Sequence, residues 1–261
     1  MALTQTIVGL LVRMRMAGLF DLGTARVLDL GEQNLYGDVR SSDLPAIARA
    51  LKLGADRVAE TEAEVAGLTA AAAPTLAFDL AKLVYRLVFD CTTCQAIDLN
   101  GTEAAWRFDL NQPLPIAEIF DVVTNFGTSE HVFDQARLFR SVHDLTRPGG
   151  LMLHAVPHQG GPDHGFYNYH PTFFHDLAAA NGYRVVMLVL MSGSETGDRL
   201  DTLKGRDSLA GLVAKGGMAR DSGLFAALHR PFENRPFQAP MQGYYAGELT
   251  DAGRAAWEDR R

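Results

Sequence analysis

Short apolar runs alternate with amphipathic helical patterns along this chain. Polar residues, Gly or Pro bound each apolar run, as is typical of buried strands. The predicted strands are Val27–Leu30, Ala96–Leu99, Trp106–Leu110, Phe120–Thr124, Gly150–Val156, Arg184–Leu190 and, from a weaker pattern, Gly223–His229. The predicted helices are Thr4–Gly18, Leu44–Leu53, Leu76–Phe89, Phe133–Leu145, Pro171–Asn181 and one near the C-terminus. This alternation predicts an α/β fold in which helices cover a parallel sheet.

Proline and glycine mark the clearest element boundaries. Pro171 suits the first turn of a helix, and Asn181-Gly182 suits a left-handed helix end. The stretch TRPGG at 146–150 ends one helix and turns into the next strand. These signals fix the helix–strand order in the second half of the chain.

Two stretches are longer than a minimal doubly wound sheet requires. The interval between the first two strands predicts an extra helical insertion at about 38–90, because one crossover helix needs far fewer residues. Residues 192–218 are polar and rich in glycine, which predicts an inserted loop. Residues 1–24 form a predicted N-terminal helix and 231–261 an extension rich in proline and aromatic residues. The α/β domain is therefore expected at 25–230.

Composition narrows the classes of partner. The chain has 261 residues, of which 47% are hydrophobic, so it can bury one large core. Its net charge of -7 and the absence of a basic stripe argue against nucleic acid and favour a small-molecule partner. No apolar stretch is long enough to span a membrane, and Arg13 and Arg15 interrupt the apolar N-terminal segment, unlike in a signal peptide. A soluble, cytoplasmic protein is expected.

Cys91 and Cys94 are the only cysteines. Their C-x-x-C spacing fits half of a zinc site, but no second pair completes it. A thioredoxin-like redox pair is another interpretation, although the surrounding pattern does not fit one. The preferred interpretation is two ordinary thiols.

Acidic residues follow the predicted strands at the edge where open parallel sheets bind ligands. Asp98 ends the second strand and Asp109 ends the third. One carboxylate there can accept both hydroxyls of a ribose, and another can accept from an exocyclic amine. The sequence VLDLGEQN, which spans the first strand and the turn after it, begins like a dinucleotide-binding turn, but Gln33 stands where a G-x-G-x-x-G motif has its second glycine. The combination favours a nucleoside ligand other than NAD, because a pyrophosphate needs the missing glycines.

Five segments together resemble the class I S-adenosylmethionine-dependent methyltransferases. In chain order they are VLDLG, AIDLNG, FDLNQPLP, FDVVTNFGTSEHV and LTRPGGLMLHAVP, and the resemblance spans roughly residues 25–230. It implies a Rossmann-like, doubly wound, mostly parallel seven-stranded sheet, here with the helical insertion after the first strand. It also implies S-adenosylmethionine as the cofactor. That cofactor has no phosphate, which makes the missing glycines tolerable.

The resemblance assigns roles to residues at the strand ends. Gly31 lets the backbone approach the methionine part, Asp98 takes the ribose hydroxyls and Asp109 lies beside the adenine. In place of the missing glycines, polar residues of the first turn could bond the methionine ammonium and carboxylate. The full predicted cofactor-binding set is Asp29, Gly31, Glu32, Gln33, Asn34, Asp98, Leu99, Asp109, Leu110, Asn125, Phe126 and Gly127.

Histidines are concentrated around and after the fifth predicted strand. One interpretation makes His131, His158 or His164 a general base for an acceptor hydroxyl or amine. A second is a metal site of His158, Asp163 and His164, and a third is packing or capping. No tight pair such as H-x-H occurs, so no metal is assigned. The segment GFYNYHPTFF is similar to one in many of these transferases, which places Tyr167, Asn168 and Tyr169 near an acceptor pocket unless they merely pack the following helix.

The preferred function is methyl transfer from S-adenosylmethionine to an oxygen or nitrogen of a small molecule, such as a sugar or a secondary metabolite. The interval 36–95 and the 192–218 loop are expected to form a substrate lid. Two alternatives stay open. One is a protein of the same fold that binds the cofactor without transferring methyl, and the other is a metal-dependent lyase or hydrolase that uses the histidine segment. The N-terminal helix and the C-terminal extension leave both a monomer and a homodimer open.

Overall fold

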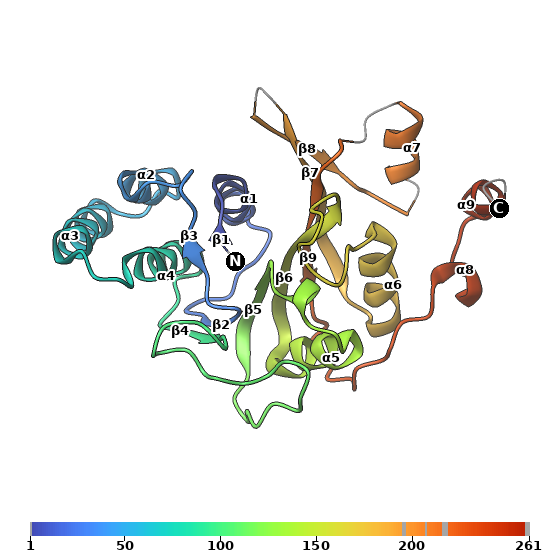
Figure 1. Ribbon diagram of the computed structural model, residues 1–261, viewed down its shortest axis with the longest axis horizontal. Coiled ribbons are helices and arrows are strands. Elements are labelled where there is room, and N and C mark those ends of the chain that lie inside the picture. The colour runs from blue at the N-terminus through green and yellow to red at the C-terminus, as the bar shows by residue number, and fades with distance from the viewer. Residues whose placement is uncertain (1, 195–196, 207, 216–218, 259–261) are drawn as a thin grey trace.

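A seven-stranded sheet forms the centre of the molecule, seen in a computed structural model that describes residues 2–194, 197–206, 208–215 and 219–258 (Figure 1). The strand order is β4-β2-β5-β6-β9-β7-β8. The strands are β2 (Arg26–Leu30), β4 (Thr93–Ile97), β5 (Phe120–Phe126), β6 (Thr146–Gln159), β7 (Arg184–Ser194), β8 (Gly197–Thr202) and β9 (Ser222–His229). A separate parallel pair joins β1 (Ala2–Leu3) to β3 (Asn34–Leu35).

The sheet is parallel on one side and antiparallel on the other. Strands β4, β2, β5 and β6 pair in parallel. Strand β9 runs antiparallel between β6 and β7, and β8 pairs antiparallel with β7. Strand β7 therefore keeps the direction of β6. The predicted seven-stranded α/β sheet is confirmed, although half of its strand pairings are antiparallel.

Helices cover both faces of the sheet (Figure 1). The helices of the described residues are α1 (Gln5–Met16), α2 (Leu44–Ala50), α3 (Ala55–Ala71), α4 (Leu76–Phe89), α5 (Gln135–Leu145), α6 (Pro171–Asn181), α7 (Ser208–Ala214), α8 (Gly243–Ala246) and α9 (Asp251–Glu258), with 3-10 turns η1 (Ser41–Asp43) and η2 (Ser129–His131). Successive strand residues Val27 and Leu28 are both fully buried and belong to different core clusters. Both faces are thus apolar, which explains why the strands read as continuous hydrophobic runs.

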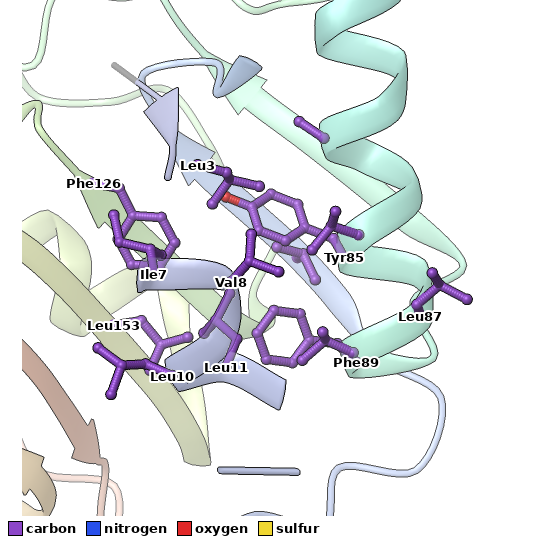
Figure 2. Packing of buried hydrophobic residues seen from close by; sticks show 14 of the residues in the cluster. Leu3, Ile7, Val8, Leu10, Leu11, Tyr85, Leu87, Phe89, Phe126 and Leu153 are labelled. Carbon is purple, nitrogen blue, oxygen red and sulfur yellow. The ribbon is translucent and has the colours of Figure 1, made fainter. Parts of the chain in front are cut away.

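The larger core joins the N-terminal segment to α4 and the sheet. Figure 2 shows Leu3 beside Tyr85, Leu11 beside Phe89 and Ile7 beside Phe126, and all six side chains are buried. Helix α1 therefore belongs to the core of the sheet face that α4 also covers. The second core lies on the other face and includes residues of α5 and α6. Helices α2 and α3 are the additional pieces of the predicted insertion, and they precede α4 in Figure 1.

Two predicted elements are corrected by the structure. Residues 106–110 form no strand, and only a bridge between Ile97 and Trp106 extends the β4 edge. Pro113 and Pro115 follow, and proline has no amide donor with which to continue a ladder. The predicted 192–218 loop instead contains the end of β7, strand β8 and helix α7, while its residues 195–196, 207 and 216–218 lie outside the described part.

The preferred interpretation of the cysteines is also wrong, because Cys91 and Cys94 are joined by a disulfide. Asp90 ends α4 in the left-handed region with φ of 50° and turns the chain towards β4. This turn brings the two Cα atoms to 6.7 Å, within the range that a disulfide spans. Among the described residues, no helix is long and apolar enough to cross a membrane.

The N-terminus of α1 is capped by Thr4, whose hydroxyl accepts from the amide of Ile7 at 3.3 Å. We expect Thr4→Ala to lower the free energy of unfolding by about 1 kcal/mol, because the helix amide loses its partner. Urea denaturation measures this change. Thr4→Ser is the matched control, because it keeps the accepting oxygen. Equal losses in both variants would trace the effect to the methyl group instead of the cap.

Candidate functional site

The turn after β2 is built around Gly31. Its φ is 77°, which favours glycine, and its amide donates to the carbonyl of Ile97 at 2.8 Å. The end of β2 is thereby tied to the end of β4. Gly31 lies at the base of the first of two pockets described below.

Asp29 fixes this turn from inside the sheet. Its carboxyl accepts from the Gln33 amide at 2.9 Å, from the Tyr85 hydroxyl at 3.3 Å and from the Thr124 hydroxyl. Complete burial raises the pKa of Asp29 to about 7, although these hydrogen bonds oppose the rise. Asp29 lines neither pocket, so its contribution to ligand binding passes through the turn.

The side chain of Glu32 also makes its contacts within the protein. It is buried, and its carboxylate pairs with Lys82 of α4 at 2.8 Å and accepts from the Thr102 hydroxyl at 2.9 Å. Burial acts to raise its pKa, but the bonds from Lys82 and Thr102 outweigh that effect and lower it. Gly101 packs so closely that a Cβ there would lie 2.7 Å from a Glu32 carboxylate oxygen. Glu32 therefore braces the turn instead of facing a ligand.

Gln33 joins the ends of β2 and β5. Its amide nitrogen Nε2 donates to the carbonyls of Gly31 and Phe126, both at 2.9 Å. Its Oε1 is buried and has no partner among the described residues. A glycine would leave this space open. Gln33, which stands at the position of the motif's second glycine, therefore has a structural role in joining the two strand ends. The neighbouring Asn34 belongs to β3, pairs with Ala2 and lines neither pocket.

The first pocket, which we call the Asp98 pocket, lies at the carboxyl ends of β2 and β4 and has a volume of about 290 Å³. Its lining residues are Gly31, Ile97, Asp98, Leu99, Asn100, Phe108, Asp109, Leu110, Asn111, Thr128, His131 and Val132. The oxygens of Asp98 accept from the amides of Asn100 at 2.7 Å and Glu32 at 2.9 Å. Asp109 is exposed, and hydrogen bonds from Asn111 lower its pKa. The structure thus brings Gly31, Asp98, Leu99, Asp109 and Leu110 together, as the sequence predicts.

The second pocket, the Phe126 pocket, has a volume of about 490 Å³ and lies over the ends of β5, β6 and β9. Its lining residues are Thr4, Thr6, Ile7, Phe126, Gly127, Glu130, Ala155, Val156, Pro157, Gln159, Gly161, His164, Met191, Ser192, Gly193, Asp198, Asp221, Ser222 and Gly223. The Thr6 hydroxyl donates to Asp198 and joins the N-terminal segment to β8 across this pocket. Acidic side chains line it, and neither Lys nor Arg does so among the described residues.

The segment 127–132 runs between the two pockets. Gly127 and Glu130 line the Phe126 pocket, while Thr128, His131 and Val132 line the Asp98 pocket. Asn125, just before it, is fully buried and does not reach either pocket. Its side chain forms hydrogen bonds with Ser129 at 2.9 Å and with the ring of His154 at 3.0 Å, so it holds the segment 127–132 in place from the interior.

Two of the predicted catalytic histidines lie close to the side chain of Glu130. Its Oε1 lies 3.3 Å from Nε2 of His164 and 4.0 Å from Nε2 of His131. The Phe166 amide donates to the Glu130 carbonyl at 2.8 Å, which holds the loop of His164 against η2. The sequence prediction missed Glu130, although it lies in the quoted segment FGTSEHV. Only the folded loop reveals this cluster.

The remaining predicted residues lie elsewhere. His158 is buried with Nδ1 at 2.8 Å from the Tyr169 carbonyl, and burial lowers its pKa. Tyr169 is buried and donates to Gln135 at 2.6 Å, while Tyr167 donates to the Phe133 carbonyl at 3.0 Å. Asn168 contacts the Gly160 carbonyl at 3.4 Å. None of the four lines either pocket, which favours the alternative that this segment packs α6 onto the sheet.

Comparison with known families gives the class of domain. Residues 78–188, which run from α4 into β7, match a family model described as "Methyltransferase domain". This part of the chain is therefore similar to a methyltransferase domain. This match agrees with the predicted resemblance to the methyltransferases. The matched residues include Asp98, Asp109 and Glu130 but not the turn after β2.

Individual relatives match this chain over a short segment or at low identity. A segment of 55 residues is 42% identical to a ubiquinone biosynthesis O-methyltransferase of Ruegeria pomeroyi, and it covers 21% of this chain and 22% of the relative. The match thus spans about a fifth of that relative's length. Solved structures with similar folds include the N-methyltransferase NodS of Bradyrhizobium japonicum with S-adenosyl-L-homocysteine (13% identity, 87% of each chain, TM-score 0.40). TehB of Haemophilus influenzae is another (11% identity, 87% of this chain and 63% of that chain, TM-score 0.46).

Proposed function

We propose that this protein transfers a methyl group from S-adenosylmethionine to an oxygen or nitrogen of a small molecule. The observation that carries the proposal is the shared wall of the two pockets. One pocket presents carboxylates for a nucleoside, the other is large enough for a compact acceptor, and segment 127–132 lines both. Methyl transfer needs the acceptor atom and the donor sulfur on opposite sides of the methyl carbon, aligned for in-line displacement.

The Asp98 pocket supplies groups that suit the nucleoside part. A carboxylate has about four acceptor sites, and two backbone amides occupy only part of this capacity at Asp98, which leaves sites for ribose hydroxyls. Asp109 and Leu110 line the same pocket, which supports their proposed contacts with the adenine amine and ring. Gly127, with φ of 71°, gives close access to backbone near the second pocket. When bound, S-adenosylmethionine supplies a methyl group on a sulfonium leaving group.

The Phe126 pocket supports a small acceptor without negative charge. Its lining includes the apolar side chains of Ile7, Phe126 and Met191 and the acidic side chains of Asp198 and Asp221. An anionic acceptor would meet repulsion there and find no lysine or arginine among the described lining residues. We infer that the cluster of Glu130, His131 and His164 promotes the loss of the acceptor proton.

Calorimetric titration of the purified protein tests the proposed cofactor. We expect S-adenosylmethionine and S-adenosylhomocysteine to bind with micromolar affinity and NAD not to bind, because the turn at Gln33 offers no pyrophosphate site. Binding would then justify a screen of uncharged and cationic acceptors for methylated product. Absence of binding to both adenosyl compounds would overturn the proposal.

One observation favours a second candidate, a protein that binds the cofactor without transferring methyl. The side chains of Glu32 and Gln33 make contacts within the protein, which leaves fewer polar groups for the methionine part. Retained binding with no product across a broad acceptor panel would support this candidate, and a methylated product would end it. The division into domains, the homodimer and the cytoplasmic location stay predictions.

A further inference from the structure

Glu130, His131 and His164 present three metal-ligand atoms that all lie within 4.8 Å of one another. The separations from Glu130 Oε1 are 3.3 Å to His164 and 4.0 Å to His131. Ligands that bind one metal at about 2.0–2.2 Å lie roughly 3 Å apart, so small side-chain movements bring the three atoms onto one ion. Two imidazoles and one carboxylate form a donor set that suits several first-row divalent metals.

The carboxylate of Glu130 is built into the protein and lacks a full set of partners. The side chain of Glu130 is 1% exposed, and its Oε2 has no hydrogen-bond partner among the described residues. No Lys or Arg of the described chain pairs with it, and its neighbours in the cluster are the two histidines. A buried carboxylate without a counter-charge is costly, and a bound cation would remove that cost.

The backbone holds the three residues in place before any ligand arrives. Glu130 and His131 are neighbours on η2, where the His131 amide donates to the Thr128 carbonyl at 3.0 Å. The loop of His164 is tied to η2 through the Phe166 amide. Gly165 lies so close that a Cβ there would come within 2.9 Å of the Glu130 carbonyl oxygen. The approach of His164 to Glu130 is therefore a feature of the backbone and not of one rotamer.

We propose that Glu130, His131 and His164 bind one divalent first-row cation, such as Zn²⁺ or Mn²⁺, between the two pockets. This site differs from the metal alternative of the sequence, because the backbone carbonyl of Tyr169 holds His158 in the interior. The cation keeps coordination positions open towards the Phe126 pocket, which Glu130 and His164 both line.

The role of the cation rests on the proposed methyl transfer, although its binding does not. A bound cation lowers the pKa of a coordinated hydroxyl. The acceptor hydroxyl then gives its proton to water, and its oxygen bonds to the methyl carbon. The bond from carbon to sulfur breaks, and its electron pair stays on sulfur. This chemistry selects an oxygen acceptor among those that the pocket admits.

The test uses untagged full-length protein, stripped of metal with a chelator and titrated separately with ZnCl₂ and MnCl₂. We expect about one ion per chain with a dissociation constant of about 1 µM or tighter for at least one of the two metals. His164→Gln and Glu130→Gln should each weaken that binding at least about 10-fold, because each removes a ligand. Circular dichroism and melting of the metal-free variants establish that they fold.

His170→Gln is the matched control, because His170 is exposed and lies against His158, outside the cluster. Its metal affinity should equal that of the parent protein. Less than about 0.1 ion per chain at saturating metal, or equal affinities in all four proteins, would overturn the site. Metal binding without S-adenosylmethionine binding would keep the site and end the proposed function. The converse result would end the site and keep the function.

Discussion

Asp98→Ala is expected to weaken the binding of S-adenosylmethionine about 10–100-fold. Hydrogen bonds to a charged group contribute about 1.5–3 kcal/mol each, and the ribose would lose its carboxylate partner. The same loss should appear for S-adenosylhomocysteine, because the two compounds share the ribose. Calorimetric titration at one salt concentration measures both dissociation constants.

Asp98→Asn provides the matched variant for this test. The asparagine keeps one accepting oxygen, so it should lose less affinity than the alanine does. Asp98 also accepts from the amides of Glu32 and Asn100, and a melting curve therefore accompanies each titration. Unchanged affinity in a folded Asp98→Ala protein would remove Asp98 from the ribose site. A protein that unfolds without a separate binding defect would give Asp98 a structural role only.

The sequence predicts the framework of the fold because local signals agree with the tertiary structure. Helices α4 and α6 have the bounds that the sequence predicts, since each has an apolar pattern and α6 also has a proline start and a glycine stop. Strand β8 was not predicted, because its sequence GDRLDT is polar and has no strand pattern. Its extended conformation comes from pairing with β7 at the edge of the sheet. The segment 106–110 reads as a strand from its composition, but it makes a single bridge.

Part of the candidate site is predictable for a similar reason. The carboxyl ends of neighbouring parallel strands lie at one edge, so Gly31 and Asp98 had to meet there once the strand order was known. The roles of Glu32 and Gln33 were not predictable, because their partners Lys82 and Phe126 are distant in the sequence. Glu130 meets His164 only through the path of the loop at 160–166, for which the sequence pattern gives no signal.

Asp29→Asn is expected to change how the free energy of unfolding depends on pH. Burial raises the pKa of Asp29 from 3.8 to about 7, so the folded protein holds a proton that the unfolded chain releases. The stability that this proton provides is complete below pH 4 and is lost as the pH rises through 7. Between pH 5 and pH 8 the parent protein should lose on the order of 3 kcal/mol through this group. The asparagine variant carries no such proton.

Urea denaturation of both proteins at pH 5 and pH 8 measures this effect as a difference between variant and parent. The comparison is needed because His154 acts in the opposite direction: burial lowers its pKa from 6.5 to about 3, so it destabilises the folded protein as the pH falls. That contribution is common to both proteins and cancels. Asp109→Asn is the control, because hydrogen bonds from Asn111 lower the pKa of Asp109 and keep it ionised throughout this range. A pH dependence that is the same in Asp29→Asn and the parent would show that Asp29 is already charged in the fold. Thr124 and Tyr85 would then stabilise a carboxylate at the base of the turn, and the turn after β2 would carry a fixed negative charge beneath the cofactor site.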